Sequence, residues 1–231
     1  MECLYIPELE SSSREITIEG EEFRHLRALR LREGESVMLT SGKGICAIAK
    51  VINYSKNEAR ASVTEVLPNH GENSVRCGVG IGILDSRERM EFALEKSIEL
   101  GVTDFYPILC EFSQKQKVSI DRLVGKAIAA VKQSKRSILP VIHQPVTIEE
   151  LLKKSNEWSR IIVGDANGEH VNNDNRDETS LILVGAEGGF SPKEINSLQN
   201  DPRTTLISLG NRRLRAETAA IAALCLLTKV N

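Results

Sequence analysis

Hydrophobic and polar positions follow two different patterns along the 231-residue chain. In the first 67 residues the pattern is typical of strands bounded by turn-forming residues such as Gly, Asn and Ser. The β-compatible runs in this part lie at residues 37–40, 45–52 and 59–67. A polar segment at residues 68–74 follows and predicts a domain boundary.

One helix interrupts this first part. The spacing of Phe23, Leu26 and Leu29 predicts a helix from Gly20 to about Arg32, with these three side chains on its buried face.

From Arg76 onward, short apolar runs alternate with segments of helical periodicity. The predicted strands lie at 77–84, 105–109, 161–163, 181–184 and 204–209. The predicted helices lie at 87–100, 120–131, 191–198 and 216–228, and the polar stretch 167–179 is predicted to be an exposed loop. Such alternation predicts a mainly parallel sheet covered on both faces. The fold class is therefore α/β, with a small β-rich domain at residues 1–70 and a larger domain at residues 74–231.

Composition narrows the class of protein. Apolar residues make up 41% of the chain and charged residues 27%, which is enough for a buried core. No apolar run approaches the ~20 residues of a membrane span, and no secretory signal is recognisable. The five cysteines are scattered without a CxxC pair, so we expect no zinc ribbon, no disulfide framework, no bound metal and a cytoplasmic protein. The net charge of −2 excludes a uniformly cationic nucleic-acid coat but permits a local basic patch.

The segment 181–194 has the pattern of a strand, a glycine loop and a helix start. Gly185, Gly188 and Gly189 follow the carboxyl end of the predicted strand, where open α/β sheets bind ligands close to the backbone. Residues 191–194 have the chemistry of a capping box with Pro at the first helical position. No Gly-Lys-[Ser/Thr] follows, which excludes a P-loop. The alternative is a tight strand–helix turn without a ligand.

A second loop repeats this arrangement. Gly210 follows a predicted strand, and Arg212, Arg213 and Arg215 then stand at the beginning of the last helix, where positive charge opposes the helix dipole. A ligand or an internal carboxylate is therefore expected to compensate them. The Ala-rich helix at 216–228 suits close packing, either in an ordinary core or at a subunit interface.

The two loops together resemble the paired signatures of SPOUT-superfamily methyltransferases, specifically the family that methylates N3 of a uridine in 16S ribosomal RNA. Residues 185–194 are similar to Gly-Pro-Glu-Gly-Gly-Phe/Leu-Ser-x-x-Glu, and residues 209–219 to Leu-Gly-x-Arg-aliphatic-Leu-Arg-Thr-Glu-Thr-Ala. Further segments that resemble the family lie at 25–31, 95–102, 132–134 and 139–140. The chain departs from the family pattern at Phe112 (usually Arg), Ala186 (Pro), Arg213 (aliphatic) and Ala216 (Thr).

The resemblance implies a PUA-like RNA-binding β-barrel followed by an α/β trefoil knot, assembled as a homodimer that uses S-adenosylmethionine as its cofactor. The implied reaction is methylation of N3 of a uridine, by resemblance uridine 1498, in the 16S rRNA of the small ribosomal subunit. The implied cofactor-binding residues are Val184, Gly185, Glu187, Gly188, Gly189, Leu209, Gly210, Leu214 and Thr218. The alternative is a non-catalytic RNA-binding factor for ribosome assembly.

The chemistry of the implied reaction suggests catalytic candidates. Uridine N3 must lose its proton before it attacks the methyl group, so arginines can stabilise the uracil anion and a carboxylate can accept the proton. Arg215 and Glu217 are the first candidates and Arg212 the third. In the alternative interpretation, Arg215 and Glu217 pair with each other and organise the fold.

A row of cations in the first domain predicts RNA contacts. Arg24, Arg27 and Arg30 are spaced three residues apart beside the buried stripe of the predicted helix. Phosphate contacts of this kind position an RNA substrate. The alternative is an ordinary solvated face.

Overall fold

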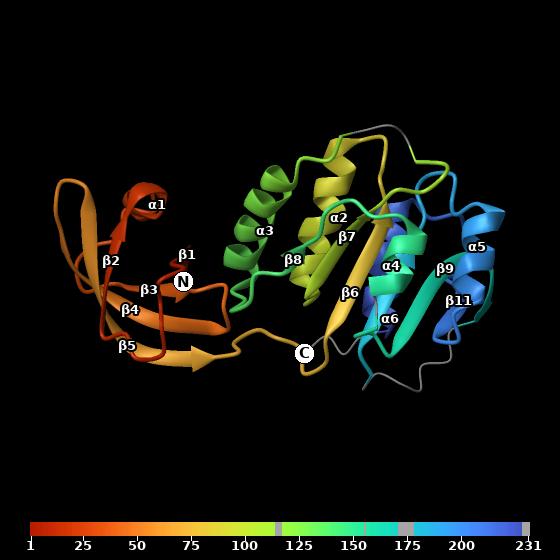
Figure 1. Cartoon of the computed structure of the whole chain (residues 1–231). Coiled ribbons are helices and arrows are strands. Elements are labelled where there is room, and N and C mark those ends of the chain that lie inside the picture. Colours follow the sequence, from red (N-terminus) through yellow and green to blue (C-terminus); the bar gives the residue numbers. More distant parts are fainter. Residues whose placement is uncertain (114–116, 155, 171–177, 228–231) are drawn as a thin grey trace. The chain divides into compact units, whose positions relative to one another are not determined.

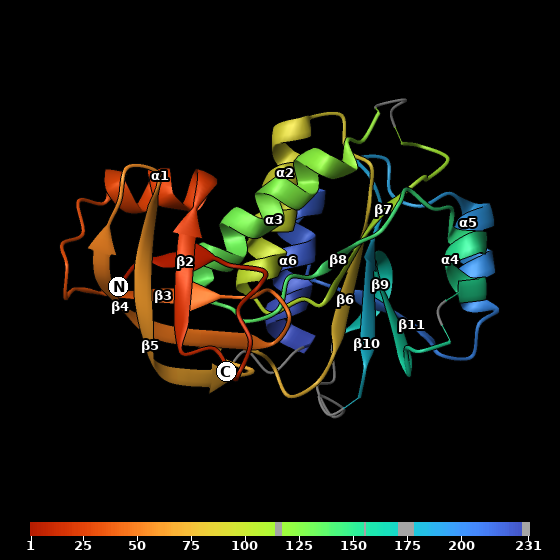
Figure 2. The same ribbon diagram turned by 60° about the vertical axis from the view of Figure 1, so that its left-hand side comes forward.

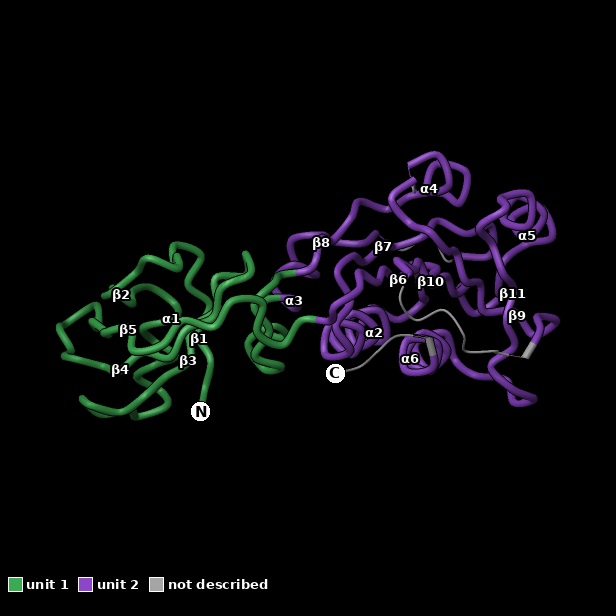
Figure 3. The backbone as a smooth tube through the Cα atoms, turned by 90° about the horizontal axis from the view of Figure 1, so that it is seen from below, with its two compact units in different colours: residues 1–72, 128–139 green, residues 73–127, 140–231 purple. Residues whose placement is uncertain are grey.

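The computed structural model describes residues 1–113, 117–154, 156–170 and 178–227. The chain forms two compact units, shown in green and purple in Figure 3. Unit 1 contains Met1–Glu72 and Ile128–Leu139, and unit 2 contains Asn73–Ala127 and Pro140–Asn231. Residues 128–139 therefore return to unit 1 from the middle of the chain, whereas the predicted division at residues 70–74 assigns them to the second domain.

Unit 1 is built on a five-stranded sheet with the order β1-β3-β4-β5-β2 (Figure 1). Its strands are β1 (Cys3–Tyr5), β2 (Glu15–Glu19), β3 (Ser36–Thr40), β4 (Ile45–Tyr54) and β5 (Glu58–Pro68). The β1–β3 pair is parallel and the other pairs are antiparallel, which makes a mixed half-barrel whose edges are β1 and β2. The long β4–β5 hairpin curves through this unit (Figure 2).

The three predicted runs become β3, β4 and β5, so this part of the prediction is confirmed. Strands β1 and β2 were not predicted. The first has only three residues and the second has only Ile16 and Ile18 on its buried face. Strand β1 is too short for a periodic signal, whereas Glu15–Glu19 alternates polar and apolar residues as a half-buried strand does, and this signal was missed.

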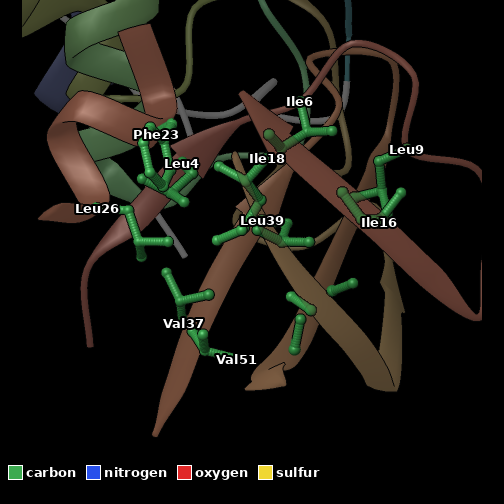
Figure 4. Packing of buried hydrophobic residues seen from close by; sticks show 14 residues of the cluster. Leu4, Ile6, Leu9, Ile16, Ile18, Phe23, Leu26, Val37, Leu39 and Val51 are labelled. Atoms are coloured by element: carbon green, nitrogen blue, oxygen red, sulfur yellow. The ribbon is translucent and has the colours of Figure 1, made fainter. Parts of the chain in front are cut away.

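Helix α1 (Gly20–Ala28) contributes Phe23 and Leu26 to the core of unit 1. Figure 4 shows these side chains beside Leu4 and close to Ile18 and Leu39 of the sheet. The helix is shorter than predicted, because it ends at Ala28 and not near Arg32. Arg30 lies beyond the helix in a left-handed conformation with φ of 55°, so it does not continue the row formed by Arg24 and Arg27.

A buried ion pair holds the returning segment of unit 1. Arg136 donates from Nη2 to Oε2 of Glu72 at 2.6 Å, and the two side chains are only 2% and 7% exposed. The other oxygen of Glu72 accepts from the backbone N–H groups of Ser137 and Ile138, both at 2.9 Å. The Arg136 carbonyl accepts from Oγ1 of Thr40 at 2.7 Å. Four polar contacts thus fasten residues 136–138 to the rest of unit 1.

Unit 2 contains a six-stranded sheet with the order β11-β9-β10-β6-β7-β8. Its strands are β6 (Cys77–Gly82), β7 (Asp104–Ile108), β8 (Val141–Ile142), β9 (Arg160–His170), β10 (Ser180–Val184) and β11 (Thr204–Ser208). Every pairing is parallel, which confirms the predicted parallel sheet. Strand β9 is longer than predicted and includes residues 167–170 of the expected loop, whereas residues 171–177 of that loop lie outside the described residues.

Helices cover both faces of this sheet (Figure 3). The helices after α1 are α2 (Arg87–Glu99), α3 (Ile120–Ser134), α4 (Ile148–Lys154), α5 (Pro192–Gln199) and α6 (Ala216–Leu227). Helices α2 and α6 pack together on one face, where Ala220 and Ala223 are fully buried, and α4 and α5 cover the other. Thr228, the predicted end of the last helix, lies outside the described residues.

Within the described part of the chain, no helix has the length and apolar character needed to span a membrane. The trefoil knot stays a prediction.

The buried ion pair of unit 1 generates a stability prediction. Arg136→Met should lower the free energy of unfolding by about 3–5 kcal/mol, because it leaves the Glu72 carboxylate buried without its counter-charge. Urea unfolding followed by circular dichroism measures this change. Lys50→Met, which removes an exposed cation of β4, should change the same free energy by less than about 0.5 kcal/mol. Equal effects of the two variants would contradict the role of the pair.

Candidate functional site

A cavity of about 690 Å³ opens where the parallel strands of unit 2 end. Its walls come from residues 85–86 after β6, residues 184–189 after β10 and residues 213–216 after β11. A smaller cavity of about 170 Å³ adjoins it and shares Gly164 and Leu214 with it. The carboxyl edge of a parallel sheet is where open α/β folds bind ligands.

The structure brings most of the predicted cofactor residues to these two cavities. The residues of this set that line the larger cavity are Val184, Gly185, Glu187, Gly188, Gly189 and Leu214. Leu209 and Gly210 line the smaller cavity, together with Leu214. Thr218 lines neither cavity and is exposed on α6.

The three catalytic candidates lie in different environments. Arg215 is exposed and lines the larger cavity, and Arg212 is exposed and lines the smaller one. Glu217 is buried in the first turn of α6 and lines neither cavity.

The glycine loop has the predicted local structure. Oγ of Ser191 accepts from the backbone N–H of Glu194 at 3.3 Å, and the Glu194 carboxylate accepts from the backbone N–H of Ser191 at 2.7 Å. This capping box starts α5 directly after the loop, as predicted. Gly189 has a φ of 74° and donates its N–H to the Ala186 carbonyl at 2.9 Å, which closes a tight turn.

Tight packing explains several of these glycines. A Cβ atom at Gly185 would lie 2.5 Å from the carbonyl carbon of Gly189, and one at Gly188 would lie 2.8 Å from Cβ of Phe112. Phe112, which stands where the resembling family has Arg, is thus the side chain that covers Gly188. Gly210 differs, since its φ of 107° requires glycine although the space around it is open.

The centre of the site is Arg89 on α2, a residue that the sequence analysis did not single out. Its Nε and Nη2 donate to the two carboxylate oxygens of Glu217 at 3.0 and 2.7 Å. Its Nη1 donates to Oε1 of Glu187 at 2.7 Å and to Oδ1 of Asp85 at 3.1 Å. One guanidinium therefore connects the β6–α2 loop, the glycine loop and α6. The positions of Arg89 and its carboxylate partners have no regular spacing in the sequence. The one available signal was that Arg89 lies in the first turn of a predicted helix, directly after a strand that ends at this edge of the sheet.

The Arg89 contact also determines the state of Glu217. Burial by itself would raise the pKa of this carboxyl, but the hydrogen bonds from Arg89 and the nearby backbone N–H, with a smaller effect of Arg215, hold the pKa below its ordinary value. Glu217 is therefore ionised at neutral pH, and its two oxygens are occupied by Arg89. The salt bridge to Glu217 that the structure contains comes from Arg89, not from Arg215.

The charged groups of the cavity have both signs. Asp85 and Glu187 supply carboxylates, whereas Arg213 and Arg215 supply guanidiniums, and Nη2 of Arg213 donates to the Glu187 carbonyl at 3.2 Å. Such a pocket suits a ligand that carries positive and negative groups together. Among the described residues, no group of three or more His, Cys, Asp or Glu side chains is placed to hold a metal ion.

Known proteins resemble this chain over most of its length. The family model described as "RNA methyltransferase domain" matches residues 71–228, and the one described as "RNA methyltransferase PUA domain" matches residues 18–64. The ribosomal RNA small subunit methyltransferase E of Rickettsia conorii is 31% identical over 202 residues, which cover 85% of this chain and 81% of that protein. This chain belongs to the ribosomal RNA small subunit methyltransferase E family. The predicted family is thereby confirmed, and with it the prediction of a methyltransferase.

Solved structures of similar proteins have the same fold. The enzyme of Neisseria gonorrhoeae bound to S-adenosyl methionine is 28% identical, with a TM-score of 0.86 over 97% of this chain and 95% of that one. A methyltransferase of Legionella pneumophila in complex with the same cofactor is 26% identical, with a TM-score of 0.83 over 96% and 95% of the two chains.

The environment of Glu217 generates a pH prediction. Because the folded-state pKa is lowered, this carboxylate adds stability above its unfolded pKa of about 4.3, and that stability is lost as the pH falls through the folded pKa. Glu217→Gln should therefore lower the free energy of unfolding at pH 7 by about 1–3 kcal/mol. The difference from wild type should shrink as the pH falls from 5 to 3.

Urea unfolding at a series of pH values tests this expectation. Glu149→Gln, which changes an exposed carboxylate of α4, serves as the control and should stay within about 0.5 kcal/mol of wild type. A Glu217→Gln deficit that did not depend on pH would contradict the proposed ionisation.

Proposed function

We propose that this protein transfers a methyl group from S-adenosylmethionine to N3 of a uridine in 16S rRNA of the small ribosomal subunit. The observation that carries the proposal is the pair of glycine loops that line two adjoining cavities, with carboxylates and arginines on their walls. The relatives named above act on ribosomal RNA of the small subunit or bind this cofactor. Position 1498 is the uridine that the resemblance suggests.

The cavity fits the cofactor in size and in chemistry. Its volume of about 690 Å³ is typical of small-ligand sites, and Gly185, Gly188, Gly189 and Gly210 contribute backbone without side chains of their own to the two cavities. When bound, S-adenosylmethionine supplies a methyl group on a positively charged sulfur. The mixed charges of Glu187 and Arg213 match its ammonium, sulfonium and carboxylate groups.

The arginines provide the electrostatic part of the reaction. Arg215 lines the larger cavity, where its guanidinium can stabilise the negative charge that uracil carries once N3 has lost its proton. Arg212, at the smaller cavity, can bind the same nucleotide through its phosphate. A carboxylate with a lowered pKa is a weak proton acceptor, so in this proposal Glu217 acts through Arg89, which it holds in place.

Unit 1 carries the RNA-binding part of the proposal. Arg24, Arg27 and Arg30 are exposed; Arg24 has only a weak contact of 3.5 Å with Glu21, and the Arg27 guanidinium lies 5.9 Å from the centre of the Phe23 ring. Their guanidiniums are therefore accessible to phosphates.

The neighbouring cations of the returning segment are less available. Lys132 donates to Glu22 at 2.7 Å, and Arg136 is buried against Glu72. For this reason we assign the phosphate contacts to the three arginines of the α1 region.

Two further parts of the proposal rest on the family resemblance. We propose a homodimer that uses α6, because this helix exposes Thr218, Cys225 and Leu226 beside its small buried alanines. A ribosomal substrate also implies a cytoplasmic location.

Methylation of small ribosomal subunits tests the function directly. Subunits that lack the modification, incubated with the protein and S-adenosylmethionine, should gain one methyl group at N3 of a single 16S rRNA uridine, as mapped by mass spectrometry of nuclease fragments. Arg215→Gln should lower the rate at least tenfold, or about 1.4 kcal/mol in the barrier. Lys193→Gln, at an exposed cation of α5, should not change it. Methylation of another atom would contradict the proposal, and RNA binding without methylation would favour an assembly factor.

Salt dependence tests the RNA contacts of unit 1. Each phosphate contact that is lost should reduce the slope of log K against log salt concentration by about 0.7–0.9. Replacement of Arg24, Arg27 and Arg30 by Gln should therefore flatten the slope and weaken RNA binding for all sequences alike. The matched control replaces Arg14, Lys50 and Lys56, three exposed cations of the same unit, by Gln. If both triple variants changed the slope equally, the arginines would contribute only general charge.

A further inference from the structure

Arg89 collects three carboxylates that come from different segments of unit 2. Salt bridges connect it to Asp85 at 3.1 Å, to Glu187 at 2.7 Å and to Glu217 at 2.7 Å. A single guanidinium compensates only one of these charges. These three carboxylates therefore exceed the charge of Arg89, and two of them, those of Asp85 and Glu187, line the larger cavity, which Arg213 and Arg215 also line.

The three carboxylates differ in their availability to a ligand. Glu217 is 8% exposed and has both oxygens bound by Arg89, whereas Asp85 is 56% exposed and largely screened by solvent. Glu187 is 33% exposed and lines the cavity. Its Oε1 accepts both the Arg89 contact and the backbone N–H of Asp85 at 3.2 Å.

These contacts orient Glu187 from two directions. Arg89 and the Asp85 N–H hold the carboxylate, and Arg213 holds the backbone carbonyl of the same residue at 3.2 Å. A charge that is fixed before the ligand arrives interacts more strongly with it than a charge that must first be ordered. Glu187 is thus the best-placed anion in the pocket.

We propose that Glu187, positioned by Arg89, recognises the positive charge on the cofactor's sulfur and makes the pocket prefer S-adenosylmethionine to S-adenosylhomocysteine. This inference rests on the proposed function. The two ligands share adenosine, ammonium and carboxylate groups, and they differ in the methyl group and in the charge on sulfur. A carboxylate beside the sulfur attracts the charged sulfonium and has much less attraction for the neutral thioether. The product is therefore released more readily than the cofactor.

Binding calorimetry with both ligands measures this preference separately from catalysis. For wild type, we expect the Kd of S-adenosylhomocysteine to exceed that of S-adenosylmethionine. Glu187→Gln keeps the size of the side chain and removes its charge, so it should reduce the ratio of the two Kd values at least fivefold, mainly by weakening S-adenosylmethionine. A general distortion of the pocket would weaken both ligands and leave the ratio unchanged. Glu149→Gln is the matched control outside the cavity and should keep the wild-type ratio.

Variants of Arg89 test its positioning role. Arg89→Met leaves Glu217 buried without its partner and can fail to fold, so the informative protein is the double variant Arg89→Met/Glu217→Gln, which removes both charges of that pair. We expect it to fold and to have a ratio below that of wild type, since Glu187 has lost its Arg89 donor and keeps only the backbone N–H of Asp85. Arg89→Lys, which keeps the charge, should lie between this variant and wild type.

The outcomes separate the two proposals. Wild-type protein that bound neither ligand would overturn the proposed function. Wild-type protein that bound both, together with an unchanged ratio in Glu187→Gln, would overturn only the recognition of charge. A wild-type ratio in the double variant would show that Arg89 serves only as the counter-charge of Glu217.

Discussion

The site of unit 2 depends on the hydrogen-bonding capacity of one guanidinium. Arg89 offers several donors in a fixed plane, and it uses them on carboxylates that follow β6, follow β10 and begin α6. Lysine could not hold these groups in the same way, because it presents a single charged nitrogen. The arrangement of these segments around the larger cavity therefore depends on a residue that lines this cavity itself and lies almost 100 residues before the glycine loop in sequence.

Charge compensation explains the arginines that follow β11. Three cations near the beginning of a helix are unfavourable by themselves, and the sequence predicts that a ligand or a carboxylate offsets them. The structure contains such a carboxylate at Glu217, whose pKa Arg215 helps to lower, whereas Arg213 donates to the backbone carbonyl of Glu187. Glu217 is paired with Arg89, and the Arg215 guanidinium lines the larger cavity.

The two loops require glycine for different physical reasons. At Gly185 and Gly188, the loop backbone and Phe112 already occupy the space that a Cβ atom would need. At Gly210 the space is open, and the left-handed backbone alone requires glycine. The alternative of a tight structural turn is thus correct for part of the first loop, and it is compatible with ligand binding because a compact turn also exposes its backbone to the cavity.

Local sequence patterns were sufficient to predict the alternation of strands and helices in unit 2, the capping box at Ser191 and the loops that line the cavities, since each depends on neighbouring residues. The family also followed from the sequence, because the motifs at 185–194 and 209–219 are local. The contacts of Arg89 with Glu187 and Glu217, and the return of residues 128–139 to unit 1, became visible only in the folded chain. These contacts join residues far apart in the chain, and no periodicity records which distant charges meet. The short strand β1 escaped prediction for a related reason: its stability comes from pairing with β3, not from its own three residues.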